Sequence, residues 1–193
     1  MAAEELEAFR LVGGTALSLQ RGHRISVDID LFTDAPYGSI DFKKIERFLK
    51  KTYPYVDSPV KSIIGMGKSY YIGNTENNCI KLDLYYTDAF IEDVIHNDGI
   101  RLASVRELIA MKMDVVARGG RKKDFWDIHE LIPDYSFKQM LGLHKKRYPY
   151  IHERKLLKTN FTRFETADTD FDPICLRGKH WELIKLDLID FAG

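Results

Sequence analysis

The stretch LVGGTALSLQRGHRISVDIDLF, residues 11–32, decides how this chain folds. Residues 9–12 are typical of a short strand, and the glycine pair Gly13-Gly14 ends that strand. Thr15 follows in a position to cap a helix, and Gly22 is placed to end the helix. The first half of the stretch therefore predicts a strand, a tight glycine turn and a helix of about two turns.

The second half of the stretch, residues 27–32, alternates apolar and acidic side chains. A period of two predicts a half-buried strand, with Val27 on its core face and both Asp28 and Asp30 on the other face. Two neighbouring carboxylates repel each other, and a hard divalent ion such as Mg²⁺ relieves the repulsion. An ordinary exposed strand face explains the same two residues, so both interpretations stay open here.

The glycine turn has a chemical interpretation of its own. Glycines let the backbone approach a ligand closely, and a helix N-terminus offers N–H donors and the positive end of a dipole. Gly13, Gly14 and the hydroxyl of Thr15 would together suit a triphosphate. A plain turn before a capped helix gives the same residues. The order of the elements favours the ligand, because the helix leads directly to the strand with the two aspartates.

A third carboxylate lies in the strand-like run at residues 79–86. Ile80, Leu82 and Leu84 share one face there, and Asp83 shares the other face with Lys81 and Tyr85. If this strand lies beside residues 27–32, the three aspartates would hold two Mg²⁺ ions, one for the attacking hydroxyl and one for the triphosphate. A surface acid on a strand is the alternative.

The character of the chain changes near residue 103. The first part has strand-like runs and three helical stretches, whereas the second part has helical spacing almost throughout, beginning with a cap at Ser104. Helices are expected at 3–9, 41–51, 104–118, 122–132, 136–147, 151–160 and 178–190, strands at 60–65, 68–73, 79–86 and 100–102, and a loop at 165–172. We therefore predict an α+β (mixed α/β) fold with a mixed sheet, divided into domains at residues 1–102 and 103–193.

Several polar residues outside the strands are further candidates for the site. Lys112 and Arg118 would reach a triphosphate, although a solvated helix face explains them equally well. Asp124 and Asp127 would orient those cations or the acceptor, or serve only as acids in a helix's first turn. Further candidates for nucleotide contacts are Lys123, Arg24 and Ser26.

The composition limits the possible partners. The 193 residues carry 29 basic and 29 acidic side chains, so net charge gives no general attraction to nucleic acid or membrane. The N-terminus has no signal-peptide pattern, and no apolar run approaches the ~20 residues of a membrane span. We expect a soluble cytoplasmic protein without a membrane partner.

The glycine pair and Thr15, followed after twelve residues by Asp28-Ile29-Asp30, resemble the signature of the polymerase-β nucleotidyltransferase superfamily. The full stretch of residues 11–32 is similar to the AbiEii/AbiGii-type toxin family. The later residues resemble that family's downstream pattern: Lys112, Ala117, Arg118, Lys123, Asp124 and Asp127. The resemblance implies a polymerase-β-like core, transfer of a nucleotide from an NTP to an acceptor, which in some members is the 3′ end of tRNA, and a cognate antitoxin protein.

The leading hypothesis is a Mg²⁺-dependent enzyme that moves a nucleoside monophosphate to an acceptor hydroxyl, with RNA, such as tRNA, as the acceptor. A basic, aromatic-interleaved run at residues 145–158 favours RNA. One alternative is modification of a small molecule of the antibiotic type, which a deep acidic pocket would favour. Another is a toxin module that binds GTP or another NTP without turnover.

Overall fold

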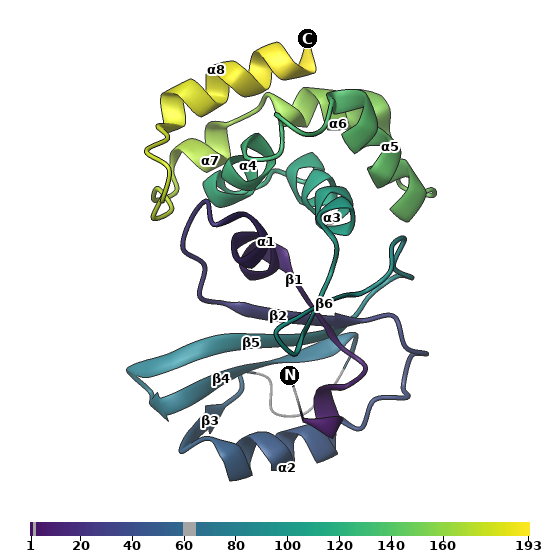
Figure 1. The fold of residues 1–193 in the computed structure, drawn as a ribbon, viewed down its shortest axis with the longest axis vertical. Helices are drawn as coiled ribbons and strands as arrows, with labels where there is room; N and C mark the ends of the chain where they lie inside the picture. Colours follow the sequence, from purple (N-terminus) through teal and green to yellow (C-terminus); the bar gives the residue numbers. More distant parts are fainter. Residues whose placement is uncertain (2, 60–64) are drawn as a thin grey trace. The chain divides into compact units, whose positions relative to one another are not determined.

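The computed structural model describes residues 1, 3–59 and 65–193 (Figure 1). They form two compact units, Met1–Thr15 with Val27–Ala103 and Ala16–Ser26 with Ser104–Gly193. The boundary therefore falls within the first helix, and residues 16–26 join the helical second unit, whereas the sequence-based division placed them in the first. The strand expected at 60–65 lies, apart from its last residue, outside the described residues.

The first unit is built on a seven-stranded mixed sheet in the order β3-β4-β5-β2-β1-β7-β6. The pairs β2–β5 and β1–β7 are parallel and the other pairs are antiparallel. This confirms the predicted mixed sheet, although β3 and β6 were not expected from the sequence. The strands are β1 Arg10–Val12, β2 Ile29–Thr33, β3 Tyr55–Asp57, β4 Gly67–Thr75, β5 Asn78–Tyr86, β6 Ile95–Asn97 and β7 Ile100–Leu102.

One face of this sheet is packed against helix α2, Phe42–Thr52 (Figure 1). The helix begins where the sequence predicts, because the Asp41 carboxylate accepts a hydrogen bond from the Lys44 backbone N–H at 2.9 Å. Phe42 meets the ring of Tyr86, at the end of β5, with the ring centroids 6.0 Å apart. The apolar alternation of β5 thus faces α2, and its polar alternation faces away.

Two elements around the glycine pair differ from expectation. The helix expected at 3–9 is a single 3-10 turn, η1, Glu4–Leu6. Helix α1, Gly13–Arg21, begins at the first glycine, so the glycine pair forms its first turn and Thr15 is not its cap. Gly22, with φ of +61°, follows the helix as predicted. In addition, β2 begins only at Ile29, which leaves Val27 63% exposed instead of in the core.

The second unit is helical, as predicted. Its core includes the two tryptophans, Trp126 and Trp181, whose rings stack at 6.4 Å. The only helix of this unit that the sequence did not indicate, within the described residues, is the short α7 in the segment expected to be a loop. The helices are α3 Val105–Ala117, α4 Lys122–His129, α5 Phe137–Arg147, α6 Arg154–Phe161, α7 Glu165–Asp168 and α8 Trp181–Ala192. Within residues 1, 3–59 and 65–193, no helix is long and apolar enough to cross a membrane.

Candidate active site

Two of the three predicted aspartates are neighbours across the sheet. Asp30 on β2 and Asp83 on β5 are register partners in the parallel pair. Their side chains therefore leave the same face, the one opposite α2, with their backbones one strand spacing apart, about 4.8 Å. The Asp83 side chain is 16% exposed, and its Oδ1 atom is buried without a hydrogen-bond partner among the described residues.

Asp28 lies just before β2, not within it as the alternation suggested. Its backbone carbonyl accepts a hydrogen bond from the hydroxyl of Thr15. This bond ties the start of α1 to the start of β2 in the first unit. Thr15 thus fixes the backbone at Asp28, instead of capping the helix.

The backbone conformation of Gly13 and its closeness to Asp30 explain why a glycine is needed at the start of α1. Its φ of +67° is a left-handed conformation that disfavours side chains. A Cβ atom built on Gly13 would lie only 2.2 Å from Oδ2 of Asp30. The glycine therefore allows the helix start, with its backbone N–H donors, to approach the Asp30 carboxylate directly. Gly14 follows in the same turn and is half-buried.

A lysine that we had not assigned to the site completes this group. The Lys81 ammonium lies 2.6 Å from Oδ2 of Asp83. The hydrogen bond to Asp83 is the main reason why the pKa of Lys81 is raised; the charges of Asp83, Asp30 and Asp28 add to the effect, and burial opposes it. Lys81 thus interacts electrostatically with all three carboxylates. Its place on the polar face of β5 was visible in the sequence, but its pairing was not.

The fit of a divalent ion to these residues can be judged from their geometry. In the described part of the chain, no group of three or more His, Cys, Asp or Glu side chains is arranged ready to hold a metal ion. Two features nevertheless suit one. Oδ1 of Asp83 is an unpartnered, buried carboxylate oxygen, and oxygen ligands are what Mg²⁺ prefers. The Asp30 carboxylate, its neighbour across the strands, lies against the glycine turn.

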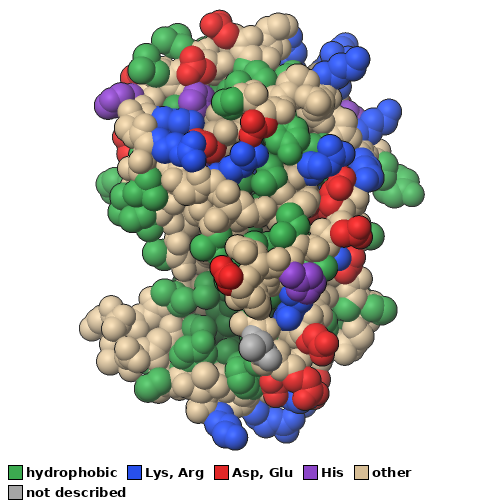
Figure 2. Space-filling model, viewed as in Figure 1, with side chains coloured by type: hydrophobic (Ala, Val, Ile, Leu, Met, Phe, Trp, Pro, Cys, Tyr) green, Lys and Arg blue, Asp and Glu red, His purple; other side chains and the backbone are tan. Residues whose placement is uncertain are grey.

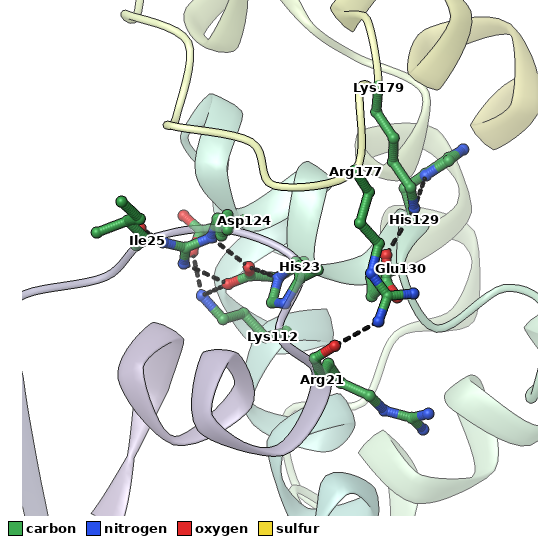
Figure 3. A network of polar contacts seen from close by, with 11 residues as sticks. Arg21, His23, Ile25, Lys112, Asp124, His129, Glu130, Arg177 and Lys179 are labelled. Carbon is green, nitrogen blue, oxygen red and sulfur yellow. Dashed lines mark hydrogen bonds and ion pairs between the residues drawn. The ribbon is translucent and has the colours of Figure 1, made fainter.

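The second unit holds another polar group, which includes His23, Lys112 and Asp124 (Figure 3). The side chain of Asp127 is fully buried, and its two oxygens accept hydrogen bonds from Nε and Nη2 of Arg24 at 2.6 and 2.8 Å. His23 Nε2 lies 2.8 Å from the same carboxylate. Lys112 Nζ lies 2.7 Å from Asp127 and 2.6 Å from Asp124. We call these five residues the buried ionic cluster.

The charges of the buried ionic cluster stabilise each other. Burial by itself would raise the pKa of Asp127, but the Lys112 charge and the hydrogen bonds from His23 and Arg24 outweigh it and hold the pKa below its usual range. For Lys112, burial would lower the pKa, but Asp127 and Asp124 keep it above its usual value. Asp127 and Lys112 therefore remain charged in the folded protein. No pattern in the sequence pointed specifically to His23.

The other side chains that were predicted to contact the nucleotide differ in how far they are exposed. Lys112 is only 6% exposed, which rules out a solvated helix face. The side chain of Arg118 is 71% exposed and pairs with Asp114 one turn earlier. Lys123 and Ser26 are both half-buried.

The expected basic run at residues 145–158 is divided by the fold. Arg147 is buried in an ion pair with Glu107, and so contributes no surface charge. Tyr150 is fully exposed. The run's exposed cations are Lys145, Lys146, Arg154, Lys155 and Lys158. On the face drawn in Figure 2, basic and acidic side chains are interspersed over the second unit, with no continuous basic stripe.

Comparison with known proteins relates this geometry to a family. Residues 1–191 match the family described as nucleotidyl transferase AbiEii toxin, type IV TA system. An uncharacterized protein of Aquifex aeolicus (strain VF5) is 29% identical over 168 residues, which are 82% of this chain and 75% of the relative.

Two solved structures share the fold. JHP933 from Helicobacter pylori has a TM-score of 0.60 and 20% identity, over 96% of this chain and 82% of that chain. MenT4, a nucleotidyltransferase toxin from Mycobacterium tuberculosis H37Rv, has a TM-score of 0.54 and 16% identity, over 95% of this chain and 75% of that chain. The family resemblance expected from residues 11–32 is thereby confirmed. Because the family match runs through both units and includes every site residue described above, the chain belongs to the AbiEii family of nucleotidyl transferase toxins of type IV toxin–antitoxin systems.

Proposed function

We propose that this nucleotidyltransferase depends on Mg²⁺ and transfers a nucleoside monophosphate from an NTP to an RNA hydroxyl, with Asp28, Asp30 and Asp83 as the acidic residues of the reaction. The observation that carries the proposal is the register of β2 and β5. It makes Asp30 and Asp83 neighbours on one face of the sheet, with Oδ1 of Asp83 unpartnered. Such an oxygen is costly to bury unless a ligand uses it.

The chain's own residues would divide the work as follows. Mg²⁺, when held by the three aspartates, would offset the charge of the triphosphate and of the leaving pyrophosphate. Gly13 and Gly14 would let the backbone donors at the start of α1 bind phosphate oxygens. Asp83 would hold, through its unpartnered Oδ1, the metal ion beside the attacking hydroxyl, and would in this way assist deprotonation of that hydroxyl.

The buried ionic cluster would act by positioning. Asp124 and Asp127 would hold Lys112 and Arg24, and thereby fix the segment just before Asp28. Arg118, another cation proposed to contact the triphosphate, has a side chain that is 71% exposed and therefore accessible to a ligand. Lys123 and Ser26, half-buried, would provide the remaining nucleotide contacts.

An RNA acceptor is supported by the exposed part of residues 145–158. Lys145, Lys146 and Lys155 are exposed and lie within five positions of Tyr150 along the chain, and Tyr150 is itself fully exposed. Cations beside an accessible aromatic ring suit phosphate contact combined with base stacking. A tRNA is the acceptor to test first. The family also implies a cognate antitoxin, which we propose as the physiological partner.

The test is transfer of label from each α-labelled NTP, with Mg²⁺, to total tRNA. We expect label in RNA with the wild-type protein and none with Asp30→Ala. Asp57→Ala, which removes an exposed aspartate on β3 of the same sheet, is the matched control and should transfer normally. Label in a small-molecule acceptor instead of RNA would refute the RNA assignment. Tight NTP binding without transfer to any acceptor would favour a non-catalytic module, and full activity of Asp30→Ala would refute the proposed site.

A further inference from the structure

We propose that Lys81 is a resident counter-ion of the carboxylate group, which competes with a divalent ion and so makes metal binding depend on the nucleotide. The inference rests on the proposed function, because it needs Asp28, Asp30 and Asp83 to be the metal-binding residues. Lys81 would act through its charge beside Asp83, and that charge would regulate whether the site holds a metal ion.

The geometry of β5 brings the positive charge of Lys81 beside Asp83. Lys81 and Asp83 are two residues apart, so they share the face opposite α2. The ammonium lies 2.6 Å from Oδ2 of Asp83, and this leaves Oδ1 as the unpartnered oxygen. Asp30 is the register partner of Asp83. One positive charge thus lies among carboxylates that would otherwise repel each other.

Two consequences follow from that position. Lys81 offsets part of the negative charge, so the group is stable without a metal ion. The same charge repels a divalent ion that approaches Asp83, and this weakens binding of the metal alone. An NTP brings its own negative charge, which attracts the metal and offsets the repulsion by Lys81. Metal and nucleotide would therefore bind together more readily than the metal alone.

The experiment titrates Mn²⁺ alone, without nucleotide, and measures free Mn²⁺ by electron paramagnetic resonance. Even at the dielectric constant of water, one positive charge roughly 5 Å from a divalent ion weakens its binding by about tenfold. We therefore expect Lys81→Met to bind Mn²⁺ at least about tenfold more tightly than wild type. Lys81→Arg keeps the charge and should bind like wild type.

Lys68→Met is the matched control. Lys68 lies on the neighbouring strand β4 and pairs with Glu46 at the same 2.6 Å, but it is on the face that packs against α2. Its replacement should leave the Mn²⁺ affinity unchanged. Unchanged or weaker binding by Lys81→Met would overturn the proposal, because Lys81 would then only orient Asp83.

Two outcomes separate this inference from the proposed function. If Asp30→Ala binds Mn²⁺ as well as wild type does, the ion binds elsewhere and the proposed function fails. If Asp30→Ala weakens binding but Lys81→Met does not strengthen it, only the counter-ion role fails. Lys81→Gln is a second neutral variant in case Lys81→Met folds poorly. Recovery of folding on addition of Mn²⁺ would support the proposal, and failure of both neutral variants to fold even with Mn²⁺ would overturn it.

Discussion

Replacing Asp127 with alanine should strongly destabilise the second unit. Its carboxylate is fully buried and binds Arg24 and Lys112, whose side chains are only 3% and 8% exposed. Removing one partner of a buried ion pair leaves an uncompensated charge and costs about 3–5 kcal/mol. For a chain of this length, that lowers the melting temperature by roughly 10 °C. The measurement is denaturant unfolding followed by tryptophan fluorescence, because both tryptophans, Trp126 and Trp181, belong to this unit.

Asp134→Ala is the matched control for Asp127→Ala. Asp134 pairs with Arg21 at 2.7 Å in the same unit, but the Arg21 and Asp134 side chains are 27% and 48% exposed. Its loss should cost only about 0–1 kcal/mol. A cost for Asp127→Ala no larger than that of the control would refute our account of the buried ionic cluster.

The cluster also predicts a dependence on pH. Because the pKa of Asp127 is lower in the folded than in the unfolded protein, its contribution is fully present above about pH 4, the usual carboxyl pKa. The contribution is lost as the pH falls from there toward the folded pKa. The free energy of unfolding of Asp127→Asn should therefore fall less than that of wild type as the pH decreases across this acidic range.

Three further predictions concern single side chains. Gly13→Ala should abolish nucleotide transfer, because its Cβ would lie 2.2 Å from the Asp30 carboxylate, and should cost about 1–2 kcal/mol in denaturant unfolding; wild-type activity would contradict this. Thr15→Val, which removes the hydroxyl donor to the Asp28 carbonyl, should lower the transfer rate and cost about 0.5–1.5 kcal/mol of stability; an unchanged rate would show that this bond does not matter. His129 has a lowered pKa, chiefly through burial, so its neutral form is favoured on folding and stability falls as the pH drops below about 6.5; His129→Gln should reduce that slope in thermal melts, and an equal slope would refute the assignment.

Features set by nearby residues were predictable from the sequence. The alternation of residues 79–86 gave β5, and the Asp41 and Ser104 side chains gave the starts of α2 and α3. In each case the signal lies within a few residues of the feature it specifies. The three-residue strands β3 and β6 have too few residues to show a period, and they exist because a neighbouring strand pairs with them.

Features set by distant residues were not predictable. Lys112 and Arg147 lie in basic stretches that suggest solvated helix faces, yet both are buried. Lys112 is held by Asp127 on the next helix, and Arg147 by Glu107, forty residues earlier. A charged side chain is buried only where an opposite charge meets it, and that meeting depends on the tertiary fold.

The proposed site likewise combines features that nearby residues set with features that distant residues set. The alternation of the sequence predicted that Asp30 and Asp83 lie on the polar faces of their strands, but it could not supply the register that makes Asp30 the partner of Asp83, 53 positions later. It also placed Lys81 on the correct face without indicating that its ammonium pairs with Asp83. Both facts depend on how two distant strands align.

The most direct test is a crystal of the protein with Mn²⁺ and a non-hydrolysable NTP analogue, in which anomalous scattering locates the ion. We expect Mn²⁺ at about 2.0–2.2 Å from carboxylate oxygens of Asp30 and Asp83, including Oδ1 of Asp83, with the analogue's phosphates beside Gly13. Bound nucleotide with Mn²⁺ away from both carboxylates would contradict the account.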